Sequence, residues 1–196
     1  MRKCVLFSVL LLCVHLLTAC GGAGADKAER APLEELPEDY SLEQAKADGC
    51  VVHEDGDVTS GQTVWDAFAE AVSAGTAASV RLGFYYTLGD PSRYDPEYYE
   101  SIKDDYPVLY IEDLTYDGTA YTIRWFEKDG EIVKAYRYLM RYEGEPESPY
   151  ASYDSHVRYV LTNDDSVTWE DIVWGMVSSR FGDYIDHHQV YVDLIR

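Results

Sequence analysis

The sequence predicts an α+β domain: a curved antiparallel β-sheet, a meander of about five strands, with helices packed on one face. Three β-rich runs follow one another and are separated only by Asp-Gly dipeptides, which favour two-residue hairpin turns. The runs are 107–116, 119–127 and 131–142, and the dipeptides are Asp117-Gly118 and Asp129-Gly130. Helix-start signals lie before and after these strands, so helices and strands are expected to segregate along the chain.

Four short helices are predicted from side chains that can cap a first turn. Each start has a Ser, Thr or Asp that can accept a hydrogen bond from a backbone N–H of that turn. The starts are Ser41-Leu42-Glu43-Gln44, Thr59-Ser60-Gly61-Gln62, Asp95-Pro96 and Thr168-Trp169-Glu170-Asp171. Gly49 and Gly75 are expected to end the first two helices, because glycine readily adopts the left-handed conformation found there.

Further strands are predicted from alternating residues. Apolar side chains at every second position from Val80 to Leu88 indicate a strand with one buried face. A shorter alternation over 157–161 predicts another strand, and 190–195 is expected to form a last edge strand.

The first twenty residues have the layout of a signal peptide. Arg2 and Lys3 precede a short apolar run, and Leu17-Thr18-Ala19-Cys20 resembles the bacterial lipobox. The resemblance implies cleavage before Cys20 and a lipid on its sulfur. An ordinary signal cleaved elsewhere and an uncleaved anchor are the alternatives, but the run is short for a spanning helix. We therefore expect an extracytoplasmic protein anchored to the outer face of the cell membrane.

The predicted organisation has three parts. Residues 1–19 form the signal peptide, and 20–39 contain the lipidated cysteine and a flexible, Gly-rich and acidic linker. Residues 40–196 form a single globular domain, which is long enough to bury a core.

Composition excludes one class of partner. Removal of Arg2 and Lys3 with the signal leaves 14 basic residues against 36 acidic ones, so the net charge moves from −20 to −22. We expect no nucleic-acid partner, because phosphate backbones are bound by basic surfaces. The charge serves solubility or attracts cations and cationic ligands. Cys50 is the only thiol after Cys20, so an internal disulfide is excluded. We also expect the protein to be a monomer.

Five segments of the first half carry a family resemblance. They are Tyr40-Ser41-Leu42-Glu43, Asp48-Gly49-Cys50-Val51-Val52-His53, Val80-Arg81-Leu82, Thr87-Leu88-Gly89-Asp90-Pro91 and Leu114-Thr115-Tyr116-Asp117-Gly118. With them, residues 40–118 resemble an uncharacterised domain family found mainly in lipoproteins of Firmicutes-type bacteria. An insertion around 95–105 and a long C-terminal half depart from that pattern. The resemblance implies the cellular location and the type of domain, and it implies no activity.

No motif predicts a catalytic residue, a cofactor or a metal site. His187-His188 lacks the spacing of a metal-binding helix, and neighbouring residues of a strand point to opposite faces. The acidic loop 53–57 departs from the calcium-loop pattern, although weak cation binding stays open. Asp154-Ser155-His156 lacks the turn that exposes a nucleophilic serine.

Tyrosine is the unusual residue: the chain has 18 of them against 5 Phe. Alternation places Tyr136, Tyr138 and Tyr142 on one face of a predicted strand, and they are the candidate binding residues for a glycan or peptide. The alternative is a half-exposed face in which Tyr only favours strand formation.

Three functional hypotheses follow. We expect a non-enzymatic, lipid-anchored domain that binds a ligand or an envelope protein. A cell-envelope hydrolase or modifying enzyme with dispersed acids is the first alternative, which a pocket of convergent acids or histidines would support. A structural accessory lipoprotein is the second, which a broad exposed apolar patch would support.

Overall fold

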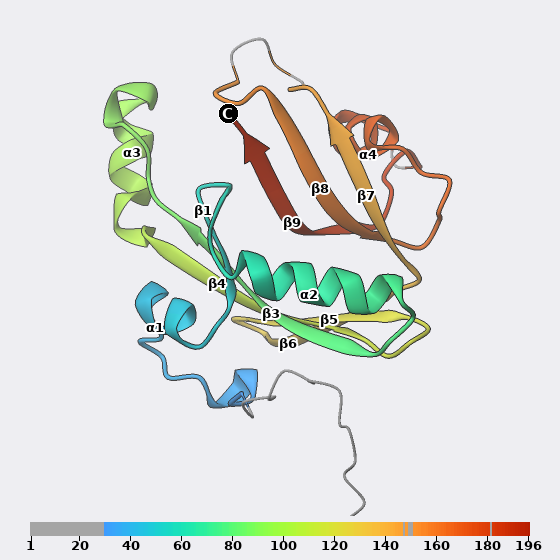
Figure 1. The fold of residues 1–196 in the computed structure, drawn as a ribbon. Helices are drawn as coiled ribbons and strands as arrows, with labels where there is room; N and C mark the ends of the chain where they lie inside the picture. Colours follow the sequence, from blue (N-terminus) through green and yellow to red (C-terminus); the bar gives the residue numbers. More distant parts are fainter. Residues whose placement is uncertain (1–29, 147, 149–150, 181) are drawn as a thin grey trace, which may run out of the picture. The chain divides into compact units, whose positions relative to one another are not determined.

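The computed structural model describes residues 30–146, 148, 151–180 and 182–196. The packed unit runs from Ala31 to Arg196 (Figure 1), so it begins earlier than the Tyr40 that the composition indicated. The predicted signal peptide and Cys20 lie outside the described residues.

The described strands form two sheets (Figure 1). The six-stranded sheet has the order β2-β1-β3-β4-β5-β6, and the three-stranded sheet has the order β7-β8-β9. Their bounds are β1 Val51–Glu54, β2 Asp57–Ser60, β3 Ala78–Tyr86, β4 Val108–Tyr116, β5 Tyr121–Glu127, β6 Gly130–Tyr136, β7 Tyr138–Gly144, β8 Ser155–Thr162 and β9 His187–Ile195.

The helices are short. The α-helices are α1 Leu42–Ala47, α2 Gln62–Ser73, α3 Pro96–Ile102 and α4 Trp169–Val177, and the 3₁₀ turns are η1 Leu33–Glu35, η2 Pro91–Arg93 and η3 Lys103–Asp105. Ser41, Asp95 and Thr168 cap α1, α3 and α4 as predicted.

The α+β class is confirmed, and the sheet differs from the expected antiparallel meander in two ways. The predicted strand 131–142 divides at Arg137, whose N–H donates to the carbonyl of Thr162 in the three-stranded sheet, so the chain changes sheets there. In addition, β1 pairs with β3 in parallel, because β2 and α2 return the chain to the same end of the sheet.

Helices also cover both faces of the six-stranded sheet, where one covered face was expected. The face that we call the α2 face carries Val51, Val80, Leu82, Leu114 and Ile123, which pack with Trp65 and Phe68 of α2. The opposite α1 face carries Val52, which packs with Ala45 of α1 and with Leu109 and Ile111 of β4. Consecutive valines in β1 point to opposite faces, and both are fully buried, so each face needs a cover.

The core joins α2 to the three-stranded sheet through aromatic side chains. The indole of Trp65 stacks on the ring of Tyr191 in β9, with centroids 4.4 Å apart, and meets Tyr159 of β8 edge-on. The hydroxyl of Tyr191 donates to Gln62 at the start of α2 at 2.7 Å. Both α2 and the three-stranded sheet therefore rest on the α2 face.

His53 forms a polar link between the two sheets. Its Nε2 accepts a hydrogen bond from the Val192 N–H at 3.3 Å, and its ring stacks on Phe84. Because the side chain is buried, its pKa falls from 6.5 to about 4. His53 is therefore neutral in the folded protein near neutral pH.

Gly61 begins α2, which corrects the predicted capping by Thr59 or Ser60; both of these lie in β2. Its φ is +77°, and a Cβ there would lie 2.4 Å from the Cys50 carbonyl oxygen. The turn from β2 into α2 thus passes too close to β1 for any side chain.

Replacement of this glycine is expected to destabilise the fold strongly. Gly61→Ala adds a backbone clash to the strain of a positive φ, for a loss of about 3 kcal/mol or more in the free energy of unfolding. Gly75→Ala is the matched control: its φ is +68°, but no atom lies within 4 Å of the added Cβ, so about 1 kcal/mol is expected. Denaturant unfolding measures both, and equal losses would contradict the close approach.

The buried His53 predicts a pH-dependent stability. Its folded pKa lies below its unfolded value, so the stabilisation is fully present above pH 6.5 and is lost as the pH falls toward 4. When the pH is lowered from 7 to 4.5, we expect the free energy of unfolding of the native protein to fall by about 2 kcal/mol more than that of the His53→Phe variant. The variant keeps the ring packing and cannot titrate. Denaturant unfolding at the two pH values measures both proteins. Equal losses of stability in the native protein and in His53→Phe would count against this role.

Candidate functional site

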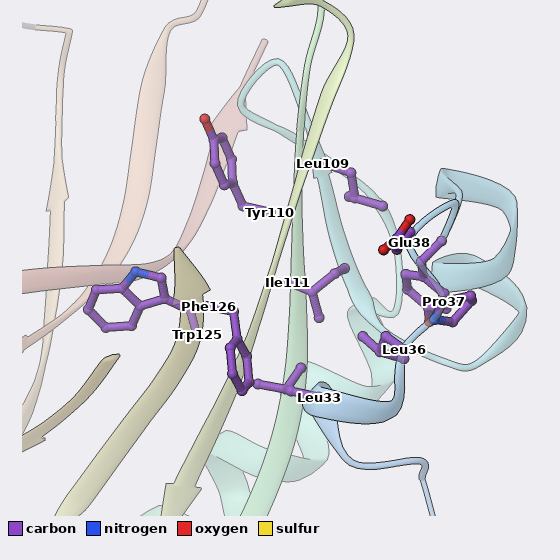
Figure 2. A pocket seen from close by; sticks show the side chains of 10 residues that line it. Leu33, Leu36, Pro37, Glu38, Leu109, Tyr110, Ile111, Trp125 and Phe126 are labelled. Carbon is purple, nitrogen blue, oxygen red and sulfur yellow. The ribbon is translucent and has the colours of Figure 1, made fainter. Parts of the chain in front are cut away.

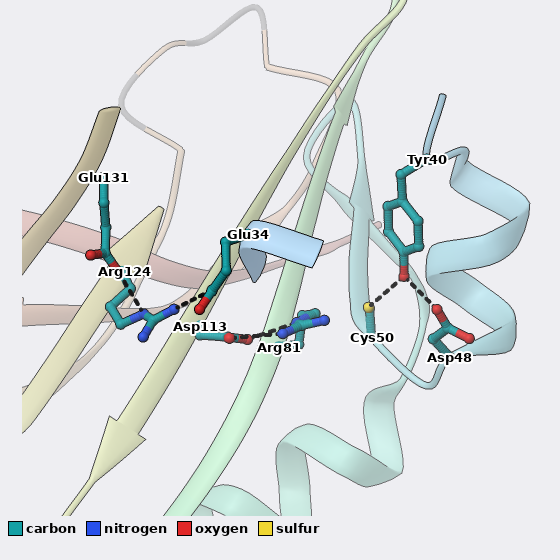
Figure 3. A network of polar contacts seen from close by, with 8 residues as sticks. All are labelled: Glu34, Tyr40, Asp48, Cys50, Arg81, Asp113, Arg124 and Glu131. Atoms are coloured by element: carbon teal, nitrogen blue, oxygen red, sulfur yellow. Dashed lines mark hydrogen bonds and ion pairs between the residues drawn. The ribbon is translucent and has the colours of Figure 1, made fainter. Parts of the chain in front are cut away.

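The N-terminal segment, defined here as residues 31–40, packs on the α1 face. Leu33 of η1 is buried, and Glu34 accepts a hydrogen bond from Arg124 of β5 at 3.2 Å. Arg124 also pairs with Glu131 of β6 at 3.1 Å, as Figure 3 shows. The end of the predicted linker is therefore part of the domain.

An open hollow of about 210 Å³, here called the groove, lies between this segment and the start of β4. Figure 2 shows Leu33, Leu36 and Pro37 on one side and Leu109, Ile111 and Phe126 on the other. Gly83 of β3 is buried, and a Cβ there would lie 3.5 Å from the side chains of Ile111 and Val52. Ile111 thus packs directly over the backbone of β3 at this position.

The groove opens where two strands separate. The β4–β5 pairing extends from Tyr116 and Tyr121 only to Glu112 and Trp125. Residues 108–111 of β4 continue to pair with β3 alone. The six-stranded sheet therefore has a notch between β4 and β5, which opens past Ile111 and Phe126.

His188 of β9 marks the last pair before the notch. Its Nε2 lies 2.8 Å from an oxygen of Glu112, and its ring lies 5.1 Å from that of Trp125, centroid to centroid. The contact is on the α2 face, opposite the groove. Burial, followed by the charge of Glu112, raises the pKa of the neighbouring Tyr86.

Beyond this contact, tyrosines occupy the α2 face of the notch. Tyr110 of β4 and Tyr86 of β3 are both exposed, with ring centroids 6.1 Å apart. In Figure 2, Tyr110 and Trp125 point away from the side on which Leu33 and Ile111 lie. The notch thus has apolar side chains on one face and aromatic ones on the other.

Acidic side chains lie along the N-terminal segment that borders the groove. Glu35, Glu38 and Asp39 of the N-terminal segment are exposed, and Glu38 contributes to the lining. The arrangement suits an apolar side chain whose neighbours carry positive charge, because the groove is apolar and the segment that borders it, including Glu38 in the lining, is acidic.

Two polar contacts hold the α1 face together beside the groove (Figure 3). Arg81, almost fully buried, binds both oxygens of Asp113 at 2.7 and 2.8 Å, and this pairing raises its pKa. The hydroxyl of Tyr40 donates to Asp48 at 2.8 Å, and burial raises its pKa well above the usual range. The first contact joins β3 to β4, and the second joins the end of the N-terminal segment to the end of α1.

The predicted tyrosine face is wrong. Tyr136 ends β6 in the six-stranded sheet, whereas Tyr138 and Tyr142 belong to β7 in the three-stranded sheet. Tyr136 is 1% exposed, and its hydroxyl lies 3.4 Å from Asp186. Tyr142 donates to the carbonyl of Val167, and burial raises its pKa. Strand alternation stops at Arg137, so Tyr136 lies apart from Tyr138 and Tyr142, which stay together on one face of β7.

The other candidate groups have structural contacts. His187 bonds to the carbonyl of Ile185, while His188 bonds to Glu112. In the acidic loop, Asp55 accepts from the N–H and hydroxyl of Thr87, and Asp57 pairs with Arg196. Ser155 and His156 are consecutive in β8, so they point to opposite faces. Within the described residues, no three metal-ligating side chains converge.

A second apolar surface lies on α4. Trp174, Met176 and Val177 are exposed, and Trp174 and Val177 line an open hollow of about 360 Å³ together with Glu170 and Asp171. Gly175 of the same helix faces inward, where a Cβ would lie 2.5 Å from the Asp183 carbonyl oxygen. Close packing of the chain after α4 thus turns these apolar residues outward.

Sequence reasoning missed the groove because its two sides come from distant segments. Leu33 and Leu36 were included in the linker on the strength of the acidic and proline residues around them. Their spacing of three residues is the one local signal that could have indicated a packed turn. The point at which β4 and β5 separate could not be predicted locally, since 107–116 and 119–127 are both rich in strand-forming residues over their whole length.

Comparison of the chain with family models, curated proteins and solved structures finds no match. Among the described residues, no helix is long and apolar enough to cross a bilayer.

Proposed function

We propose that the protein is a lipid-anchored extracytoplasmic domain that binds a basic, partly apolar segment of a protein partner in the groove. The observation that carries the proposal is the open apolar hollow beside the acidic N-terminal segment. Leu33, Ile111 and Phe126 offer apolar contact, and Glu35 and Glu38 provide charge complementary to Lys or Arg.

The address is supported by the Leu17-Thr18-Ala19-Cys20 pattern behind a basic start and an apolar run. Because the packed unit begins at Ala31, only the ten residues 21–30 lie between it and Cys20, a path of eleven Cα–Cα steps. A fully extended chain of that length reaches at most about 40 Å. Residues that line the groove, beginning with Leu33, follow this tether directly, so the tether limits how far the groove can lie from the proposed anchor.

Substitution of the proposed lipid-carrying cysteine tests whether the protein is anchored to the membrane. Cys20→Ser removes the sulfur that carries the lipid, and it is expected to shift the protein from the membrane pellet to the soluble fraction after cell fractionation. Cys50→Ser is the matched control, because Cys50 is fully buried in the domain, and it should stay in the pellet. Retention of Cys20→Ser in the membrane would contradict the anchor.

Site-specific photo-cross-linking tests the binding role. Benzoylphenylalanine in place of Phe126, at the groove, is expected to form an adduct in cells that make the protein naturally. The same probe in place of Val133 is the control: it is also exposed, and it lies on the same face two strands from β4.

Mass spectrometry of the adduct identifies the bound segment. We expect an apolar residue flanked by Lys or Arg, and an adduct from position 126 that excess unlabelled protein removes. Equal adducts from both positions, or an acidic bound segment, would contradict the proposal.

A further inference from the structure

We infer that two copies of the protein associate through the outward face of α4, with the two helices antiparallel. This face carries side chains at helical spacing, which we call the α4 stripe: Glu170, Val173, Trp174 and Val177. Trp174 is 63% exposed and Val177 is 73% exposed. The inference goes beyond the groove and its proposed partner, and it differs from the monomer that we expected from the sequence.

The inward face of α4 is already used by the domain itself. Trp169 lies below the guanidinium of Arg158 in β8, 4.7 Å from ring centroid to Cζ. Ile172 is 1% exposed, and Gly175 packs against the Asp183 carbonyl. At 100° per residue, Ile172 and Gly175 point away from the α4 stripe. The apolar residues of the stripe therefore lie outside the core of the domain.

The α4 stripe has opposite charges at its two ends. Glu170 lies in the first turn of α4, and Arg180 follows the C-terminal end of the helix; both are exposed. Two other acids near the start of the helix serve local structure, because Asp171 belongs to the capping box and Asp164 accepts hydrogen bonds from Ser166. Along the helix the surface is thus acidic, then apolar, then basic.

Antiparallel pairing of two such stripes satisfies both ends at once. With a two-fold axis midway between Glu170 and Arg180, each Glu170 lies opposite the Arg180 of the second copy, and symmetry repeats the contact. Val173 then lies opposite Val177 of the second copy, and the two Trp174 side chains meet near the axis. Parallel pairing would place like charges together at each end, which is unfavourable.

The stripe also has space for side chains of the second copy. The open hollow of about 360 Å³ lies beside Trp174 and is lined by the stripe and Asp171. In the antiparallel pair, the indole of the second copy can enter this hollow, so that both rings become buried. Burial of Trp is among the largest apolar contributions to a protein interface.

The contact is small, so we expect the pair on a membrane rather than in dilute solution. The helix has nine residues and is therefore about 14 Å long, whereas a stable interface usually buries about 800 Å² per partner. The anchor proposed at Cys20 would hold the copies on one surface and raise their effective concentration. This step rests on the proposed function.

Cysteine cross-linking in membranes of the cells that make the protein tests the pair. Val173→Cys in the full chain places a thiol on the stripe, whereas Cys50 is fully buried. With a short bismaleimide reagent we expect a product of twice the mass on a denaturing gel. Val133→Cys, an exposed position on β6, is the matched control and should stay monomeric. A monofunctional maleimide checks that both introduced thiols react.

Charge reversals in the Val173→Cys protein test the antiparallel arrangement. Glu170→Arg and Arg180→Glu are each expected to lower the yield of dimer about tenfold, because each places two pairs of like charges in contact. The two reversals together should restore the yield to within about twofold. A general effect of net charge predicts the opposite for Glu170→Arg, since a less acidic protein repels its copies less.

Removal of the central ring tests the apolar contact. Trp174→Ala should also lower the yield about tenfold. Because Trp174 is mostly exposed, the free energy of unfolding should stay nearly unchanged, and denaturant unfolding measures it. Tyr98→Ala is the matched control: Tyr98 is an aromatic residue of α3 that is 56% exposed, and its removal should leave the dimer unaffected.

Four results would overturn the inference. They are no dimer from a Val173→Cys protein whose thiol is labelled, a dimer that Trp174→Ala leaves unchanged, a double charge reversal that restores nothing, and an adduct with a different protein. Failure of the proposed function looks different. Absence of the dimer while the protein stays in the membrane pellet leaves the anchor intact, and an adduct from position 126 leaves the groove's role intact.

Discussion

The stack of Trp65 on Tyr191 determines how the two sheets are arranged. It ties α2 to β9, and Tyr159 of β8 closes the contact edge-on, so helix and three-stranded sheet share one face of the six-stranded sheet. Trp65 is 2% exposed, and truncation of such a buried side chain to alanine typically lowers the free energy of unfolding by about 3–5 kcal/mol. Because this face is filled by the domain's own core, the opposite face is left to α1 and to the N-terminal segment.

The same β9 strand reaches the point where the six-stranded sheet separates. His188 contacts both Glu112 and Trp125, the final pair of the β4–β5 ladder. Glu112 is buried and would need a partner in any arrangement, and His188 supplies one. The contact thus fixes one end of the notch, while Leu33 and Phe126 border it on the other face.

Turns and helix starts could be predicted from the sequence, because each depends on a few neighbouring residues. Asp117-Gly118 turns the chain between β4 and β5, and the side chains of Ser41, Asp95 and Thr168 start helices wherever those residues are placed. Non-local features could not be predicted. The change of sheet at Arg137 depends on Thr162, 25 residues later, and the parallel β1–β3 pair depends on the packing of α2.

The candidate site was the least predictable part. Tyr136 was expected at a surface because alternation was extended across Arg137, whereas the groove is formed by Leu33 and Ile111, far apart in the chain. The lipobox pattern that ends at Cys20 could be proposed from sequence alone, because such a pattern is a short run of residue types that does not depend on the fold.

The central claim is that β4 and β5 separate at the groove, so that the amide N–H groups of Leu109 and Ile111 have no partner in a neighbouring strand of the described chain. Amide hydrogen exchange followed by NMR tests it directly, one residue at a time. We expect the amides of Leu109 and Ile111 to exchange much faster than those of Tyr110 and Glu112, which face β3, and than that of Asp113, which faces β5. Protection of Leu109 and Ile111 equal to that of these neighbours would mean that the edge is already occupied, and it would contradict the account.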